Sequence, residues 1–142
     1  MDKFPEEGYT GKTIGEVLLI PTQIYVKEIV ELLKKIKVHG LAHITGGGLR
    51  NLPRLNKNVK FVLDDLFEPQ PVFRFLQKYG NIEDKEMYQT FNMGMGFAIV
   101  VSDKDADEAI KILKKSSDSD VKVVGRVMKG TGVEVPGLGL KF

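Results

Sequence analysis

Short apolar runs of strand length alternate along this chain with segments whose apolar residues recur at helical spacing, and this alternation limits the fold more than any other feature. The runs predicted as strands cover residues 15–20, 41–45, 59–64, 96–101, 121–128 and 132–135. The first is closed by Pro21, and the last two, separated by the turn KGTG, are predicted to end the chain as a hairpin. Strands interspersed with helices in this way indicate a mixed sheet covered by helices.

Helices are predicted over residues 25–37, 71–79 and 84–91, and again after Ser102, which begins an S-x-x-D capping pattern. For the first helix, Thr22 is a plausible N-cap, and Glu31 and Lys35 form a favourable i,i+4 pair. The segment LRNLPRL, residues 49–55, is predicted to form one or two helical turns.

The length of 142 residues and the absence of repeats or linkers indicate one domain over residues 14–142. Residues 1–13 are predicted to be an arm or the remnant of an inter-domain connection. A net charge of +2 argues against a nucleic-acid partner, and no apolar run reaches signal-peptide or membrane-helix length, so we expect a cytoplasmic protein with no membrane contact.

Several apparent motifs fail on closer inspection. Gly11-Lys12-Thr13 resembles the end of a Walker A motif, but Glu6 stands where glycine is required. His39 and His43 have a zinc-ligand spacing on a helix, but on the predicted strand they would lie about 13 Å apart. The chain has no cysteine, which excludes thiolate nucleophiles and cysteine metal sites. We therefore predict no metal site.

The most informative stretch is HITGGGLRNLPR, residues 43–54. Three successive glycines each cost about 0.5–1 kcal/mol of backbone entropy relative to alanine, so a fold keeps them where a positive φ or a close approach is needed. Such a strand-to-helix turn can aim free amides at a phosphate, with Arg50 and Arg54 adding positive charge and His43 available as an acid, base or donor. The same pattern fits a simple tight turn with His43 buried in the core, and the residues alone leave both interpretations open.

A second block, EMYQTFNMGMG at residues 86–96, carries an amide side chain among close glycines. It could contact a polar ligand. The pattern favours a structural role, however, in which Met87, Phe91 and Met95 fill the core and the glycines ease strand packing.

Taken together, LAHITGGGLRNLPR at residues 41–54, EMYQTFNMGMGFAIVV at 86–101 and GEVLLIPTQIYVK at 15–27 resemble the C-terminal half of the aminoimidazole ribonucleotide (AIR) synthetase family, also called phosphoribosylformylglycinamidine cyclo-ligases. The resemblance implies an α+β fold with three layers, α/β/α, in which helices flank a mixed, partly ferredoxin-like sheet. It also implies an ATP-dependent ligase reaction of purine biosynthesis, in which formylglycinamidine ribonucleotide is closed to aminoimidazole ribonucleotide.

The same resemblance implies that the N-terminal half of the family's enzymes is missing from this chain. The family's N-terminal half holds ATP and Mg²⁺ and forms a homodimer, and it has no counterpart here. We therefore expect a fragment or one half of a split enzyme that works with such a domain in cis or in trans and is inactive alone. The alternatives are a non-catalytic ligand-binding or assembly module, or half of a related ATP-using enzyme.

Carried over by position, the resemblance assigns His43 and Thr45 to the reacting region of the substrate. The residues implied to bind the substrate or its phosphate are Gly46, Gly47, Gly48, Arg50, Asn51, Asn92 and Gly94.

Overall fold

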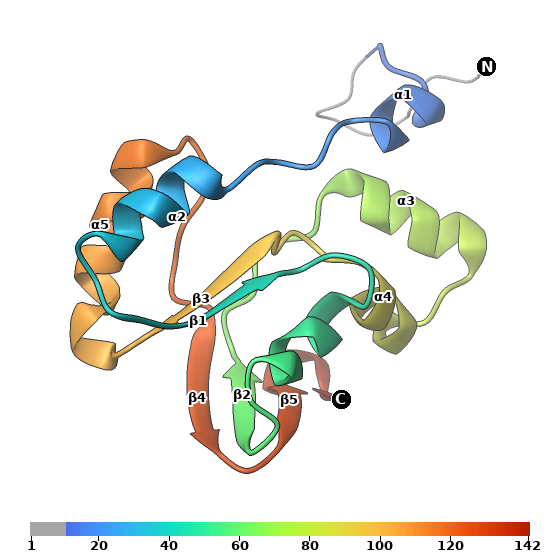
Figure 1. The fold of residues 1–142 in the computed structure, drawn as a ribbon. Helices are drawn as coiled ribbons and strands as arrows, with labels where there is room; N and C mark the ends of the chain where they lie inside the picture. Colours follow the sequence, from blue (N-terminus) through green and yellow to red (C-terminus); the bar gives the residue numbers. More distant parts are fainter. Residues whose placement is uncertain (1–10) are drawn as a thin grey trace.

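The computed structural model describes residues 11–142, and most of the predicted arm lies outside them. The elements in chain order are α1 (Ile14–Leu18), α2 (Val26–Leu33), β1 (Val38–His43), the 3-10 helix η1 (Gly48–Arg54), β2 (Val59–Leu63), α3 (Pro71–Gly80), α4 (Asp84–Thr90), β3 (Phe97–Val101), η2 (Asp103–Asp105), α5 (Ala106–Ser116), β4 (Gly125–Lys129), β5 (Gly132–Val135), η3 (Pro136–Leu138) and β6 (Leu140–Lys141). Figure 1 shows α2 and α5 side by side, with α3 and α4 on the opposite side of the strands.

The strands form two sheets. Strands β1 and β3 pair antiparallel, with His43 opposite Phe97 at one end of the pair. The second sheet has the order β4-β2-β5-β6, in which β2 runs antiparallel to β4 and parallel to β5. This mixed pairing, with helices packed against both sheets, confirms the predicted α+β class.

The predicted C-terminal hairpin is wrong, because β4 and β5 lie on either side of β2 and do not pair with each other. Strand β2 has three consecutive buried residues, Phe61, Val62 and Leu63, so both of its faces are covered. A strand buried in this way needs hydrogen-bonding partners along both edges, and β4 and β5 supply them. The pairing of β4 with β2 is confined to Gly125–Lys129. The observed strand therefore begins four residues after the start of the predicted strand, which covered residues 121–128.

The run predicted as a strand over residues 15–20 is a helix, α1. Its start carries a reciprocal capping box: the Glu16 amide donates to Thr13 Oγ1 at 3.3 Å, and the Thr13 amide donates to Glu16 Oε2 at 2.7 Å. This T-x-x-E signature satisfies helix-start amides that a short apolar run alone does not reveal.

The other helices follow the prediction with local differences. Helix α2 begins at Val26 with Tyr25 as N-cap, not Thr22, and Glu31 pairs with Lys34 at 2.6 Å instead of with Lys35. Helices α3, α4 and α5 and the short η1 all occur where periodicity placed them. Ser102 precedes η2, and its hydroxyl bonds to the Asp105 carboxylate, but it caps no backbone amide.

Two apolar cores hold these elements together. One lies between α2 and α5 and the β1–β3 pair and is built from Leu32, Ile36, Ala109, Ile112 and Leu113. The larger one joins η1, α4 and the four-stranded sheet, and its most deeply buried side chains are Ile44, Leu49, Met87 and Val133. The predicted structural role of Met87 and Met95 is confirmed, since both are buried in this second core.

Gly48 is the tightest point in the larger core. Its φ is +50°, and a Cβ there would lie 2.1 Å from the Tyr88 carbonyl oxygen and 2.7 Å from that of Phe91. Only glycine therefore lets η1 approach the C-terminal end of α4 this closely.

We expect Gly48→Ala to lower the free energy of unfolding by about 2–4 kcal/mol, because the added methyl overlaps backbone atoms at a strained φ. Urea denaturation measures the change. Gly46→Ala is the matched control, since no atom lies within 4 Å of its Cβ position and its φ is not positive. Equal stability of the two variants would contradict this account of the packing.

An ion pair links the central strands, with Lys60 Nζ 2.9 Å from Glu134 Oε2. The hydrogen bond from Lys60, reinforced by the charge of Lys141, lowers the pKa of Glu134. A carboxyl group with a lowered pKa stabilises the fold above its unfolded-state pKa and loses that contribution as the pH falls through its folded-state pKa.

The stability difference between the wild type and Glu134→Gln is therefore expected to be largest at neutral pH and to shrink below pH about 4.3, the ordinary glutamate value. Thermal unfolding from pH 7 to pH 3 checks this. A difference that stays constant over this range would show that the ion pair does not set the pKa of Glu134.

Candidate functional site

The two sequence blocks with clustered glycines meet at one end of the β1–β3 pair. The Ile44 amide donates to the Gly96 carbonyl at 2.9 Å, and Gly48 packs on the carbonyls of Tyr88 and Phe91. The turn between β1 and η1 is thus held against the segment that joins α4 to β3. Sequence reasoning named both blocks, and the fold brings them together.

The glycine turn, residues 45–48, is held by bonds on its inner side. The Gly48 amide donates to the Thr45 carbonyl at 2.9 Å, and the Arg50 amide donates to the Gly47 carbonyl at 3.0 Å. The buried Asn51 side chain donates from Nδ2 to the Gly48 carbonyl at 2.8 Å and to the Thr45 carbonyl at 3.4 Å. Asn51, predicted to contact the substrate, therefore lies under the turn and supports its shape.

The outer side of the turn is open. Thr45 and Gly46 are exposed, and no atom lies within 4 Å of the Gly46 Cβ position. Gly47 has a φ of +105°, and within residues 11–142 its amide and that of Gly46 donate to no protein acceptor. Two neighbouring free amides on an exposed turn can bind an anion. Gly48, by contrast, is buried with its amide already bonded, so it contributes to the shape of the turn.

Positive charge lies beside this opening. Arg54 Nη2 is 3.7 Å from the Cβ position of Gly47, and Arg50 is exposed on the same 3-10 helix. Neither arginine takes part in an ion pair within the described part of the chain, so both guanidinium groups are available to a ligand. Planar guanidinium groups match the geometry of phosphate oxygens.

His43 is exposed at the end of β1, so the alternative of a core histidine does not hold. Its ring lies beside the rings of Tyr25 and Phe97, at centroid distances of 5.8 and 5.9 Å. Tyr25 and Phe97 were not predicted as site residues. The only sequence signal for Tyr25 was its place in the resembling block GEVLLIPTQIYVK.

Asn92 and Gly94 shape the second turn. Asn92 Oδ1 accepts a bond from the Gly94 amide at 3.2 Å, and its carbonyl accepts one from the Met95 amide at 2.9 Å. Gly94 has a φ of +91°, and a Cβ there would lie 2.9 Å from the Glu68 carbonyl oxygen. Both residues line a cavity that does not include the glycine turn.

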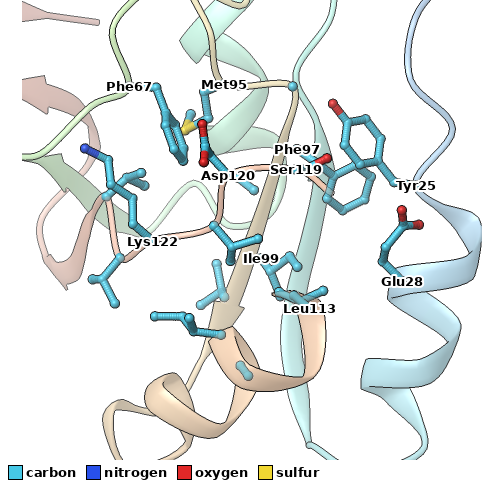
Figure 2. A pocket seen from close by; sticks show the side chains of 18 of the residues that line it. Tyr25, Glu28, Phe67, Met95, Phe97, Ile99, Leu113, Ser119, Asp120 and Lys122 are labelled. Carbon is cyan, nitrogen blue, oxygen red and sulfur yellow. The ribbon is translucent and has the colours of Figure 1, made fainter. Parts of the chain in front are cut away.

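This cavity has a volume of about 1300 Å³ and lies between α2, β3, α5 and residues 117–127. Figure 2 shows Ile99 and Leu113 in its apolar part, with Ser119, Asp120 and Lys122 on the facing segment. One carboxylate oxygen of Glu28 is buried here and has no hydrogen-bond partner among the described residues. Burial, with a smaller contribution from this carboxylate, raises the pKa of Tyr25.

The described residues contain no group of three or more His, Asp or Glu side chains that could hold a metal ion. Over residues 11–142 no helix has the length and apolar character needed to cross a membrane.

Comparison with known proteins assigns the chain to a family. Three proteins named phosphoribosylformylglycinamidine cyclo-ligase are close in sequence: that of Methanopyrus kandleri is 48% identical over 88% of this chain, that of Methanocaldococcus jannaschii 50% over 83%, and that of Thermoplasma volcanium 47% over 95%. The matched regions make up only 36%, 34% and 38% of these relatives, so this chain spans little more than a third of their length.

Among solved structures, a crystal structure of Escherichia coli HypE, a hydrogenase maturation protein, superposes with a TM-score of 0.63 over 85% of this chain and 39% of its own, at 20% identity. A second crystal structure of HypE gives the same score over 91% of this chain. At this identity the likeness concerns the fold alone.

The sequence model of the family described as "AIR synthase related protein, C-terminal domain" matches residues 2–137, nearly the whole chain. Together with relatives at about half identity, this match confirms the resemblance seen in the sequence blocks: the chain belongs to the AIR synthase related family and corresponds to its C-terminal domain.

Proposed function

We propose that this chain is the substrate-side domain of an ATP-dependent phosphoribosylformylglycinamidine cyclo-ligase, which forms aminoimidazole ribonucleotide for purine biosynthesis. Its family and the names of its relatives support the reaction class. The observation that carries the site assignment is the open glycine turn, where the amides of Gly46 and Gly47 and the guanidinium of Arg54 lie close together and have no hydrogen-bond or ion-pair partner within residues 11–142. This combination suits the 5′-phosphate of a ribonucleotide.

In the proposed reaction, ATP phosphorylates the formyl amide oxygen of the substrate, which turns that oxygen into a leaving group. The amidine nitrogen then attacks the same carbon, closes the five-membered ring and expels phosphate, so the products are aminoimidazole ribonucleotide, ADP and phosphate. On this chain, His43 and Thr45 are exposed next to the turn, where they can hydrogen-bond the reacting amide region.

The remaining parts of the proposal concern the nearly two thirds of the relatives' length that this chain does not span. We propose that this portion, in cis or in trans, holds ATP and Mg²⁺ and forms the homodimer, and that the assembled enzyme works in the cytoplasm. The substrate would then lie between the glycine turn and the partner domain, where water can be excluded from the phosphorylated intermediate.

The phosphate assignment is tested by Gly46→Val. A valine at this position has room and an ordinary φ, so the domain should fold, but its branched side chain would cover the free amides. We expect the affinity for ribose 5-phosphate, measured by isothermal titration calorimetry, to fall at least about tenfold, the value of one charged hydrogen bond.

Gly137→Val is the matched control, because Gly137 also has open space and no positive φ but lies in η3. Unchanged binding to Gly46→Val would remove the glycine turn as the phosphate site. An equal loss in both variants would point to a general effect of valine on the fold.

The proposal that the other segment of the enzyme binds ATP is tested by mixing the two segments and measuring the reaction. The chain alone, given ATP and formylglycinamidine ribonucleotide, is expected to release no ADP. Mixing it with the remaining segment of the Methanocaldococcus jannaschii relative, which is 50% identical in the shared region, is expected to restore ADP release and formation of the imidazole product. Turnover by the chain alone would refute the assignment of ATP binding to the other segment.

A further inference from the structure

Beside the glycine turn lies a shallow hollow of about 410 Å³ whose lining is almost entirely apolar. It is formed by residues 22–26, Ile29 of α2, His43 at the end of β1 and Phe97 at the start of β3. We call it the aromatic hollow, because three aromatic rings, those of Tyr25, His43 and Phe97, make its wall. No step of the proposed reaction uses Tyr25 or Phe97.

The three rings offer flat faces to a ligand. His43 and Phe97 are cross-strand partners, and their rings are stacked at 5.9 Å with an interplanar angle of 28°. Tyr25 stands against both, 5.1 Å from Phe97 in a tilted arrangement and 5.8 Å from His43 at 71°. Figure 2 shows the Tyr25 and Phe97 rings close together. Aromatic groups arranged in this way bind planar rings through stacking and edge contacts.

The phenol of Tyr25 lies against the backbone of Gly96. A Cβ on Gly96 would lie 2.0 Å from the Tyr25 hydroxyl oxygen, so the phenol rests directly on the glycine backbone. Burial raises the pKa of Tyr25, in agreement with the place of its phenol in an apolar wall. Gly96 therefore serves the hollow by making room for Tyr25.

The hollow and the glycine turn share one backbone segment. Gly46 follows His43 by three residues, a span of about 10 Å in extended chain, and the bond from Ile44 to Gly96 ties this segment to β3. That span is of the order of the separation between the phosphate and the heterocycle in a nucleotide. A nucleotide with its phosphate on the turn can thus reach the hollow with its ring.

We propose that the aromatic hollow binds the planar nitrogen heterocycle of the nucleotide, stacked on His43 and Phe97 and flanked by Tyr25. The inference rests on the proposed function, since it takes the glycine turn as the phosphate site. The substrate is open-chain where the product has a planar imidazole, so stacking stabilises the flat geometry that the reacting amidine must adopt to close the ring. The hollow thus favours the planar, ring-closing geometry over the open chain.

The test compares two probes on the full chain: 5-aminoimidazole-4-carboxamide ribonucleotide, a stable planar nucleotide, and ribose 5-phosphate, which lacks the ring. We expect the wild type to bind the nucleotide about tenfold more tightly than ribose 5-phosphate, because one base–aromatic stack increases the affinity by about this factor. Phe97→Leu should reduce this ratio to about one without changing the affinity for ribose 5-phosphate, and Phe97→Tyr should retain it.

Phe75→Leu is the matched control, because Phe75 is also half-buried and paired with another ring, that of Tyr79, but on α3. Should Phe97→Leu fail to fold, His43→Leu removes the stacked ring from an exposed position and should lower the same ratio. Proton NMR adds a structural readout: the imidazole proton of the bound probe is expected to shift upfield in the wild type and not in either leucine variant.

A wild-type ratio of one, or a ratio that neither leucine variant changes, would overturn the inference. Failure of the proposed phosphate site is distinguishable, because ribose 5-phosphate would then not bind the wild type at all. In that case the phosphate-free riboside of the same heterocycle tests the hollow directly: weaker binding to Phe97→Leu supports it, and equal binding to both proteins refutes it.

Discussion

The close approach of the Gly48 backbone to the carbonyls of Tyr88 and Phe91 is the contact on which the arrangement of this site depends. It joins η1 to α4 without a side chain between them and so fixes where the chain leaves β1. The orientation of the preceding glycine turn follows from this contact. Its inner carbonyl groups accept hydrogen bonds from Asn51 and from the local backbone, and its outer amides point to solvent. Packing of the core and exposure of the site are therefore two results of one steric constraint.

Two surfaces of different chemistry border the open side of the glycine turn. Along the turn and η1 lie amides and arginines that have no partner among the described residues, while a nearly apolar hollow with three rings lies along β1 and β3. A molecule with an anionic end and a flat ring fits both parts. The combination agrees with the proposed nucleotide substrate, for which this chain would supply the phosphate and ring contacts.

Local signals predicted most of the fold. Helices α3 and α5 carry strong periodicity or clear end signals, and β2 alternates like a strand, so each formed where expected. Two of the errors concern how backbone groups find their hydrogen-bonding partners. Whether 15–20 is helix or strand depended on the reciprocal bonds of Thr13 and Glu16, and whether β4 pairs with β5 depended on β2 needing partners at both edges. The first choice is settled by a local capping box and the second by strand pairing across the domain.

The sequence by itself determined the family, the α+β class and the glycine turn, because these follow from residue types at fixed spacings along one chain. It could not tell a ligand-binding turn from a merely tight one, nor separate the inward Gly48 from the outward Gly46 and Gly47. Only the tertiary structure separated the buried Gly48 from the outward Gly46 and Gly47, and it alone placed Tyr25 and Phe97 beside His43, because the burial of a group and its neighbours depend on contacts between segments distant in the chain.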